Sequence, residues 1–88
     1  MNIREFKYQE KINKKKLLAS RGVFLSKRED GVFSIFLFQM VNFYVEMFYD
    51  NEEEEIGYIR AFQSVNELNP YLEQIDISEI QQVLSTTN

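Results

Sequence analysis

The middle of the chain carries the apolar and aromatic pattern of β-strands. Residues 32–39 and 43–49 are rich in β-branched and aromatic side chains and lack glycine and proline, a composition that fits a pleated, packed surface. Residues 50–55 are acidic and turn-like, and residues 56–62 form the next predicted strand. Asp30-Gly31 favours a tight hairpin turn and places a first strand at residues 23–28. The pattern therefore predicts a four-stranded antiparallel meander.

The loop between the two central strands decides which side chains share a face. A two-residue turn would force positive φ on the β-branched Val41, so a three-residue loop at residues 40–42 is favoured, with Asn42 in the left-handed conformation. Successive strand residues point to opposite faces. This loop places the following residues together: Phe33, Ile35, Leu37, Phe43, Val45, Met47 and Tyr49.

The outer hairpins set the remaining pairs of residues. A turn at Asp30-Gly31 fixes the first hairpin, and a five-residue loop at residues 51–55 would join opposite charges across the last one. The predicted pairs are Leu25 with Phe36, Val23 with Phe38, Glu46 with Arg60 and Met47 with Ile59.

Both faces of the predicted sheet carry apolar side chains, whereas antiparallel sheets commonly leave one face to solvent. The first face holds Phe24, Ile35, Leu37, Phe43, Val45, Met47 and Ile59. We expect helices to cover that face. The other face is either ordinary core under a helix, a surface that stacks nucleic-acid bases, or a surface that binds a protein partner or a second copy, and the last is adopted because exposed apolar patches and aromatic residues are typical of interfaces. The predicted partner-binding residues are Phe36, Phe38, Tyr44, Phe48, Tyr58 and Phe62, and the polar pair on the same face is Glu46 with Arg60.

Helical segments are predicted on both sides of the meander. Residues 4–20 contain many strong helix formers, and Gly22 follows as a suitable terminator. After the strands, a single turn at residues 65–68 is expected, then short helices at residues 70–74 and 77–84. The fold class is α+β: an N-terminal helix, a four-stranded antiparallel meander sheet and two short C-terminal helices packed on one sheet face, in a single domain of residues 1–88.

Composition removes several kinds of chemistry. The chain has no cysteine and no histidine, which excludes disulfides, thiolate metal sites and the commonest general base. The acidic run at residues 52–55 lacks the spacing of a calcium loop and is interpreted as a solvated hairpin. Glu46 lies among apolar neighbours like a buried catalytic acid, but Arg60 opposite it indicates an ion pair, although the two could also anchor a small ligand. We predict no enzyme activity, no catalytic residue, no metal and no cofactor.

Charge is divided along the chain. The net charge of −4 combines +5 up to Asp30 with −9 from Gly31 onward. The basic cluster of Lys14, Lys15 and Lys16 suggests an alternative, a nucleic-acid-associated regulator that contacts phosphates, but a solvated helix face is favoured because the rest of the chain is acidic. The N-terminal residues lack the apolar core of a signal peptide and no apolar run is long enough to cross a membrane. The sequence thus indicates a cytoplasmic protein that forms homo-oligomers or binds a protein partner, with no membrane contact.

Overall fold

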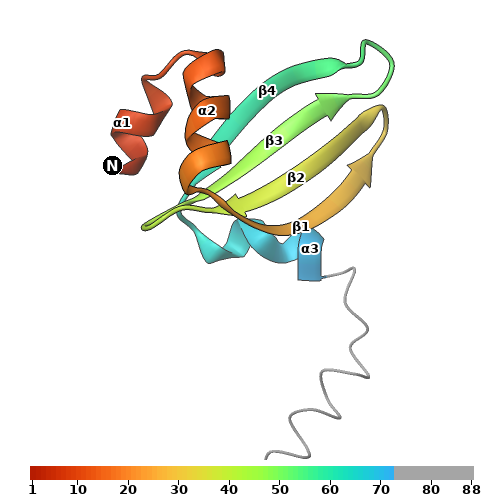
Figure 1. The fold of residues 1–88 in the computed structure, drawn as a ribbon. Helices are drawn as coiled ribbons and strands as arrows, with labels where there is room; N and C mark the ends of the chain where they lie inside the picture. Colours follow the sequence, from red (N-terminus) through yellow and green to blue (C-terminus); the bar gives the residue numbers. More distant parts are fainter. Residues whose placement is uncertain (73–88) are drawn as a thin grey trace, which may run out of the picture.

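The computed structural model describes residues 1–72, which form helices on either side of one antiparallel sheet (Figure 1). The strands follow the order β1-β2-β3-β4, so the predicted α+β meander is confirmed. The predicted helix at residues 77–84 and the end of the one at 70–74 lie outside the described residues. The elements are α1 (Ile3–Lys7), α2 (Lys11–Arg21), β1 (Val23–Asp30), β2 (Phe33–Gln39), β3 (Tyr44–Asp50), β4 (Glu55–Phe62), the 3-10 turn η1 (Val65–Leu68) and α3 (Asn69–Leu72).

The N-terminal region forms two helices and not the single helix predicted for residues 4–20. Asn2 caps α1, since its side chain accepts a hydrogen bond of 2.8 Å from the Glu5 backbone N–H. Phe6 and Leu18 both belong to one buried cluster. In a continuous helix they would lie about 18 Å apart along the axis, at 1.5 Å per residue. The break between α1 and α2 therefore lets both side chains reach the same core.

The central hairpin has a two-residue loop, so the predicted three-residue loop is wrong. Gln39 pairs with Tyr44, and the backbone N–H of Met40 donates to the Phe43 carbonyl at 2.8 Å. Val41 and Asn42 form the turn with negative φ, because the only described non-glycine residue at positive φ is Glu54. The turn thus avoids the strain that argued against it. The one-residue change in register moves every β3 side chain to the opposite face from the one predicted relative to β2.

The first hairpin turns at Gly31 and Val32, one residue later than predicted. Gly31 has φ of 59°, and Asp30 pairs with Phe33 across the turn. Positive φ at the first central residue alone suits glycine followed by an ordinary residue. A bulge between Phe24 and Ser26 then shifts the register again. The predicted pairs are therefore wrong, and the observed pairs are Lys27 with Phe36, Phe24 with Phe38 and Val23 with Gln39.

The last hairpin has the predicted pairs, Glu46 with Arg60 and Met47 with Ile59. Its loop is one residue shorter than expected, since β4 begins at Glu55, and an irregularity next to Gly57 compensates for the difference. A side chain at Gly57 would lie 3.2 Å from the Phe33 ring. Glycine there allows the close approach of the strand and the ring.

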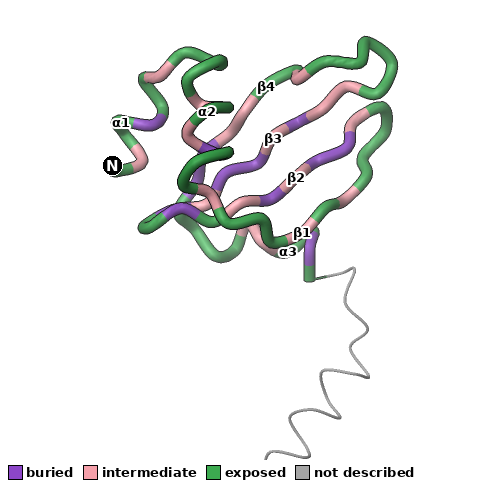
Figure 2. Tube along the Cα trace, in the orientation of Figure 1, coloured by how far each residue is buried: buried purple, intermediate pink, exposed green. Residues whose placement is uncertain are grey.

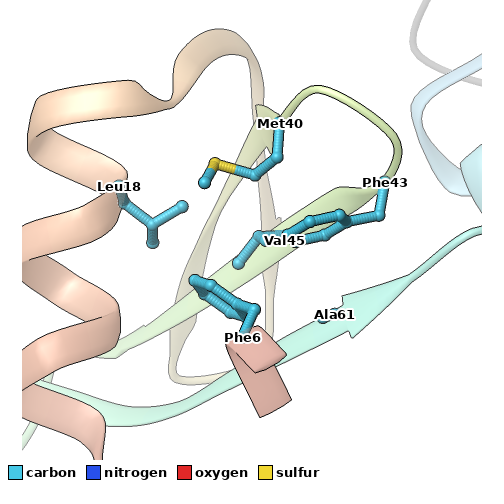
Figure 3. Close-up of a cluster of buried hydrophobic side chains, with 6 residues drawn as sticks. All are labelled: Phe6, Leu18, Met40, Phe43, Val45 and Ala61. Atoms are coloured by element: carbon cyan, nitrogen blue, oxygen red, sulfur yellow. The ribbon is translucent and has the colours of Figure 1, made fainter. Parts of the chain in front are cut away.

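Helices cover part of both sheet faces, so the expectation that they cover only one is wrong. Under α1 and α2 lies a buried cluster to which the β2–β3 turn, β3 and β4 contribute side chains (Figure 3). On the opposite face, Tyr71 of α3 packs with Leu37 and Phe62. Burial is concentrated along β2 and β3, while β1 is largely exposed (Figure 2). The first cluster consists of Phe6, Leu18, Met40, Phe43, Val45 and Ala61.

Replacing Phe6 by alanine tests whether α1 is part of the folded unit. The Phe6 side chain is fully buried and its ring lies 5.4 Å from that of Phe43. We expect Phe6→Ala to lower the free energy of unfolding by about 3–5 kcal/mol in urea titrations. Tyr8→Ala is the matched control, because Tyr8 is 83% exposed and its loss should change stability by less than about 0.5 kcal/mol. Equal effects of the two substitutions would contradict the docking of α1.

Candidate functional site

A buried carboxylate lies at the centre of the sheet face that α3 covers. Glu46 on β3 is 1% exposed. Its Oε1 accepts hydrogen bonds from Arg60 Nη2 at 2.8 Å and Nε at 3.2 Å. Its Oε2 accepts from Tyr71 Oη at 2.7 Å and from Arg28 Nη2 at 3.2 Å. The predicted pair of Glu46 and Arg60 is confirmed, and the structure adds partners from β1 and α3.

Both arginines have second partners at the rim of this network. Arg60 Nη1 lies 2.6 Å from Glu67 Oε1, and Arg28 Nη1 lies 3.7 Å from Asp30 Oδ2. The Arg28 guanidinium also lies 5.3 Å from the centre of the Tyr71 ring, within the range of a cation–π contact. The buried charge of Glu46 is thus surrounded by donors, as a carboxylate removed from water requires.

The protonation states of the donors fit this arrangement. Burial, together with the hydrogen bond to Glu46, raises the pKa of the Tyr71 hydroxyl above its ordinary value. Burial opposes the charged form of Arg28, but its interactions with Tyr71 and Glu46 outweigh that effect and raise its pKa. Tyr71 is therefore a neutral donor and Arg28 a permanent cation. Arg28 Nε is buried without a hydrogen-bond partner, but both oxygens of Glu46 are occupied by donors, so the network suits holding elements together better than transferring protons.

The six predicted partner-binding rings do not share one face. Phe36 and Phe38 lie on the face of α1 and α2, because they pair with Met47 and Val45. The other four lie on the face of Glu46, and the predicted common surface is wrong because the central loop is one residue shorter than expected. On that face Phe48 and Phe62 are buried while Tyr58 is half exposed. The four rings of this second group are Tyr44, Phe48, Tyr58 and Phe62.

Three rings form a compact group at the end of the sheet away from α3. Phe48 and Tyr58 stack with centroids 4.1 Å apart. Phe33 meets both of them edge-on, at 5.8 Å and 5.9 Å. Such aromatic pairs stabilise a sheet beyond the area that they bury. These three rings therefore pack against one another within a single chain.

The most exposed apolar segment of the sheet is the start of β1, which the sequence analysis did not single out. Val23, Phe24 and Leu25 are 60%, 55% and 43% exposed in succession, on a strand that forms one edge of the sheet. The Phe24 ring lies 6.3 Å from that of Phe36 and 5.8 Å from that of Phe38. This edge surface, defined as Val23 to Leu25, thus continues onto the neighbouring strand. Its signal in the sequence is an apolar run that does not alternate.

A cleft of about 590 Å³ lies between α2 and the β3–β4 hairpin. The Lys11 ammonium bridges the two walls by donating to the Ile56 carbonyl at 2.9 Å. The lining carries cations on the helix side and acids on the hairpin side. A charged ligand would therefore be attracted by one wall and repelled by the other. Glu46 and Arg60 do not line this cleft, which is formed by Lys11, Ile12, Lys15, Met47, Tyr49, Glu54, Glu55 and Ile56.

The three lysines predicted as a phosphate-contacting patch point to different surroundings. The Lys14 ammonium lies 5.9 Å from the centre of the Phe6 ring, Lys15 lines the cleft and Lys16 is exposed. Within residues 1–72 the structure holds no group of three side chains suited to a metal ion. None of the helices described is both long and apolar enough to span a membrane.

Comparisons with protein-family models, curated proteins and solved structures found no match to this chain.

Neutralising Glu46 tests the network, because Glu46→Gln keeps the shape of the side chain and leaves two arginines without their shared partner. We expect the free energy of unfolding to fall by about 3 kcal/mol. This is near the lower end of the cost of breaking a buried ion pair, because Arg60 stays partly exposed to solvent and keeps its ion pair with Glu67. Glu67→Gln is the control. It removes only the outer partner of Arg60 and should cost less than about 1 kcal/mol. Similar losses in urea titrations of the two variants would contradict a buried, linking role for Glu46.

Removing the Tyr71 hydroxyl should give a pH-dependent loss of stability. Tyr71→Phe loses a hydrogen bond to a carboxylate, worth about 2 kcal/mol at pH 7. Since the pKa of Tyr71 is raised on folding, its contribution is complete below about pH 10 and is lost as the pH rises through the folded-state value. The stability gap between the wild type and Tyr71→Phe should therefore narrow above about pH 10. Tyr8→Phe should match the wild type throughout, and a gap that is constant with pH would contradict the assignment.

Proposed function

We propose that this chain is a small, non-enzymatic, cytoplasmic interaction module that associates with a second copy of itself through the edge surface of β1. The observation that carries the proposal is the run of three large apolar residues, each 43% to 60% exposed, on an edge strand. Edge strands expose unpaired backbone groups, and proteins usually protect them from further strand pairing with charged side chains or a covering segment. An apolar edge of this kind is typical of an interface.

The surroundings of the edge surface support the proposal. Phe24 reaches Phe36 and Phe38, so two of the predicted partner-binding rings adjoin the surface. The opposite edge of the sheet, β4, contacts both α1 and α2, and Lys11 occupies one of its carbonyl oxygens. Among the described residues, β1 also contacts α3, but no strand pairs with its outer edge, so that edge can accept a strand of a second chain. The partner-binding role of the rings on the Glu46 face stays a prediction.

The proposed absence of catalysis rests on how the titratable groups are used. Glu46, the one carboxylate that is fully buried among the described residues, accepts hydrogen bonds at both oxygens from side chains of its own chain. A general acid or base must instead reach a substrate within hydrogen-bonding distance. The geometry of Glu46 thus favours a structural role.

Replacing Phe24 by threonine tests the proposal while keeping a residue with good strand propensity. We expect the wild type to gain mass with concentration in sedimentation equilibrium, and Phe24→Thr to weaken association by about tenfold or more, since aromatic residues dominate interface energies. Val65→Thr is the control, because Val65 is 65% exposed in η1, which follows β4 and lies outside the edge surface. A wild type that stays monomeric at the highest soluble concentration would overturn the proposal.

A further inference from the structure

The straight part of β1 has a length and a midpoint that restrict how two copies can meet. The bulge lies between Phe24 and Ser26, so regular pairing geometry extends only from Ser26 to Asp30. Full overlap of two such five-residue segments in antiparallel orientation brings Arg28 opposite its own copy. Any shift from this register shortens the overlap or runs into the bulge or the Gly31–Val32 turn.

Symmetry permits this register. A two-fold axis perpendicular to a sheet keeps each side chain on its own face, and directly opposed residues also share a face. Because neighbours along a strand point to opposite faces, a symmetric antiparallel pair must bring some residue opposite its own copy. Registers centred between two residues are thereby excluded. The register centred on Arg28 is among those allowed.

The charges of β1 match in this register. Lys27 of one copy would lie opposite Glu29 of the other, and the pair would occur twice across the axis. Within one chain these two side chains already attract each other, with Lys27 Nζ 3.2 Å from Glu29 Oε1, and both are at least half exposed. Opposite charges directly across two strands stabilise the pair, whereas like charges destabilise it. Registers centred on Lys27 or on Glu29 would each oppose two like charges on this face.

The self-opposed residue does not obstruct the pairing. Arg28 points to the other sheet face, where Glu46 lies 3.2 Å and Asp30 3.7 Å from its guanidinium nitrogens. Its charge is thus already compensated inside each chain. The same register lays Phe24 and Leu25 beside the turn that carries Val32 of the second copy, and all three are exposed in the single chain. Charged pairs at the centre are then flanked by apolar contacts.

We infer that two copies of this chain join β1 to β1 in antiparallel orientation around Arg28, forming a continuous eight-stranded sheet held by reciprocal Lys27–Glu29 ion pairs. The inference rests on the proposed self-association and adds its register. A lysine on an edge strand normally discourages the addition of another strand. Here the same lysine selects a second copy, because the acid that it needs is two residues away on an identical strand.

Charge reversal tests the register. Lys27→Glu and Glu29→Lys should each place two like-charged pairs in the interface and weaken the dimer by about tenfold or more in sedimentation equilibrium. Lys16→Glu and Glu52→Lys are the controls, because they change the net charge equally at exposed positions away from β1. The double variant Lys27→Glu/Glu29→Lys should regain the wild-type mass.

An equimolar mixture of the two single variants separates pairing between chains from pairing within one chain. In their heterodimer, each acid of the Lys27→Glu chain would lie opposite a lysine of the Glu29→Lys chain, so the mixture should regain dimer although neither variant alone does. The chain has no cysteine, so Lys27→Cys mixed with Glu29→Cys should also form a disulfide heterodimer under mild oxidation. Each cysteine variant alone should cross-link much less.

Three results would overturn the inference, and they differ in what they leave standing. If the dimer responds to Phe24→Thr but the charge variants behave like their controls, the register is wrong and the proposed function stands. If the double variant regains dimer but the mixture does not, the Lys27–Glu29 pair acts within one chain and the register is again wrong. If the wild type is monomeric at every concentration, both the register and the proposed function fail.

Discussion

The burial of one carboxylate constrains most of this structure. Glu46 is 1% exposed, and a charge removed from water at that depth is tolerated only when partners surround it. Its partners come from three other elements, Arg28 on β1, Arg60 on β4 and Tyr71 on α3. A one-residue slip of β1 would turn Arg28 to the other face. The network thus fixes the register of an edge strand and the position of α3 at one point.

Much of the fold could be predicted from local composition. Strand and helix positions followed from β-branched and aromatic runs and from the acidic segment, and opposite charges at Glu46 and Arg60 identified one register correctly. The other two registers failed at their turns. Positive φ was expected at Val41 in any two-residue loop, but that turn has no residue in the left-handed region. An error of one residue in the β2–β3 loop was enough to place the β3 side chains on the wrong face relative to those of β2, which is why the predicted aromatic surface is wrong.

The candidate site was less accessible to prediction because its parts are distant in sequence. Tyr71 lies 25 positions from Glu46 in a short helix, and no local pattern connects them. The role of Arg28 depended on a β1 register that a bulge shifts. That bulge also bears on why the start of β1 was not among the predicted partner-binding residues. Val23, Phe24 and Leu25 fit no strict alternation, and the bulge after Phe24 interrupts the assignment of side chains to faces at that point.

The simple strand order has a consequence for how the chain assembles. Each strand pairs only with its neighbour in sequence, so every hairpin closes a loop of a few residues at small entropic cost and the sheet can grow in the order of synthesis. The helices at the N-terminus behave differently, because the cluster that receives Phe6 includes Ala61 of the last strand. Helix α1, which is synthesised before the sheet, must therefore wait for nearly the whole sheet before it can dock.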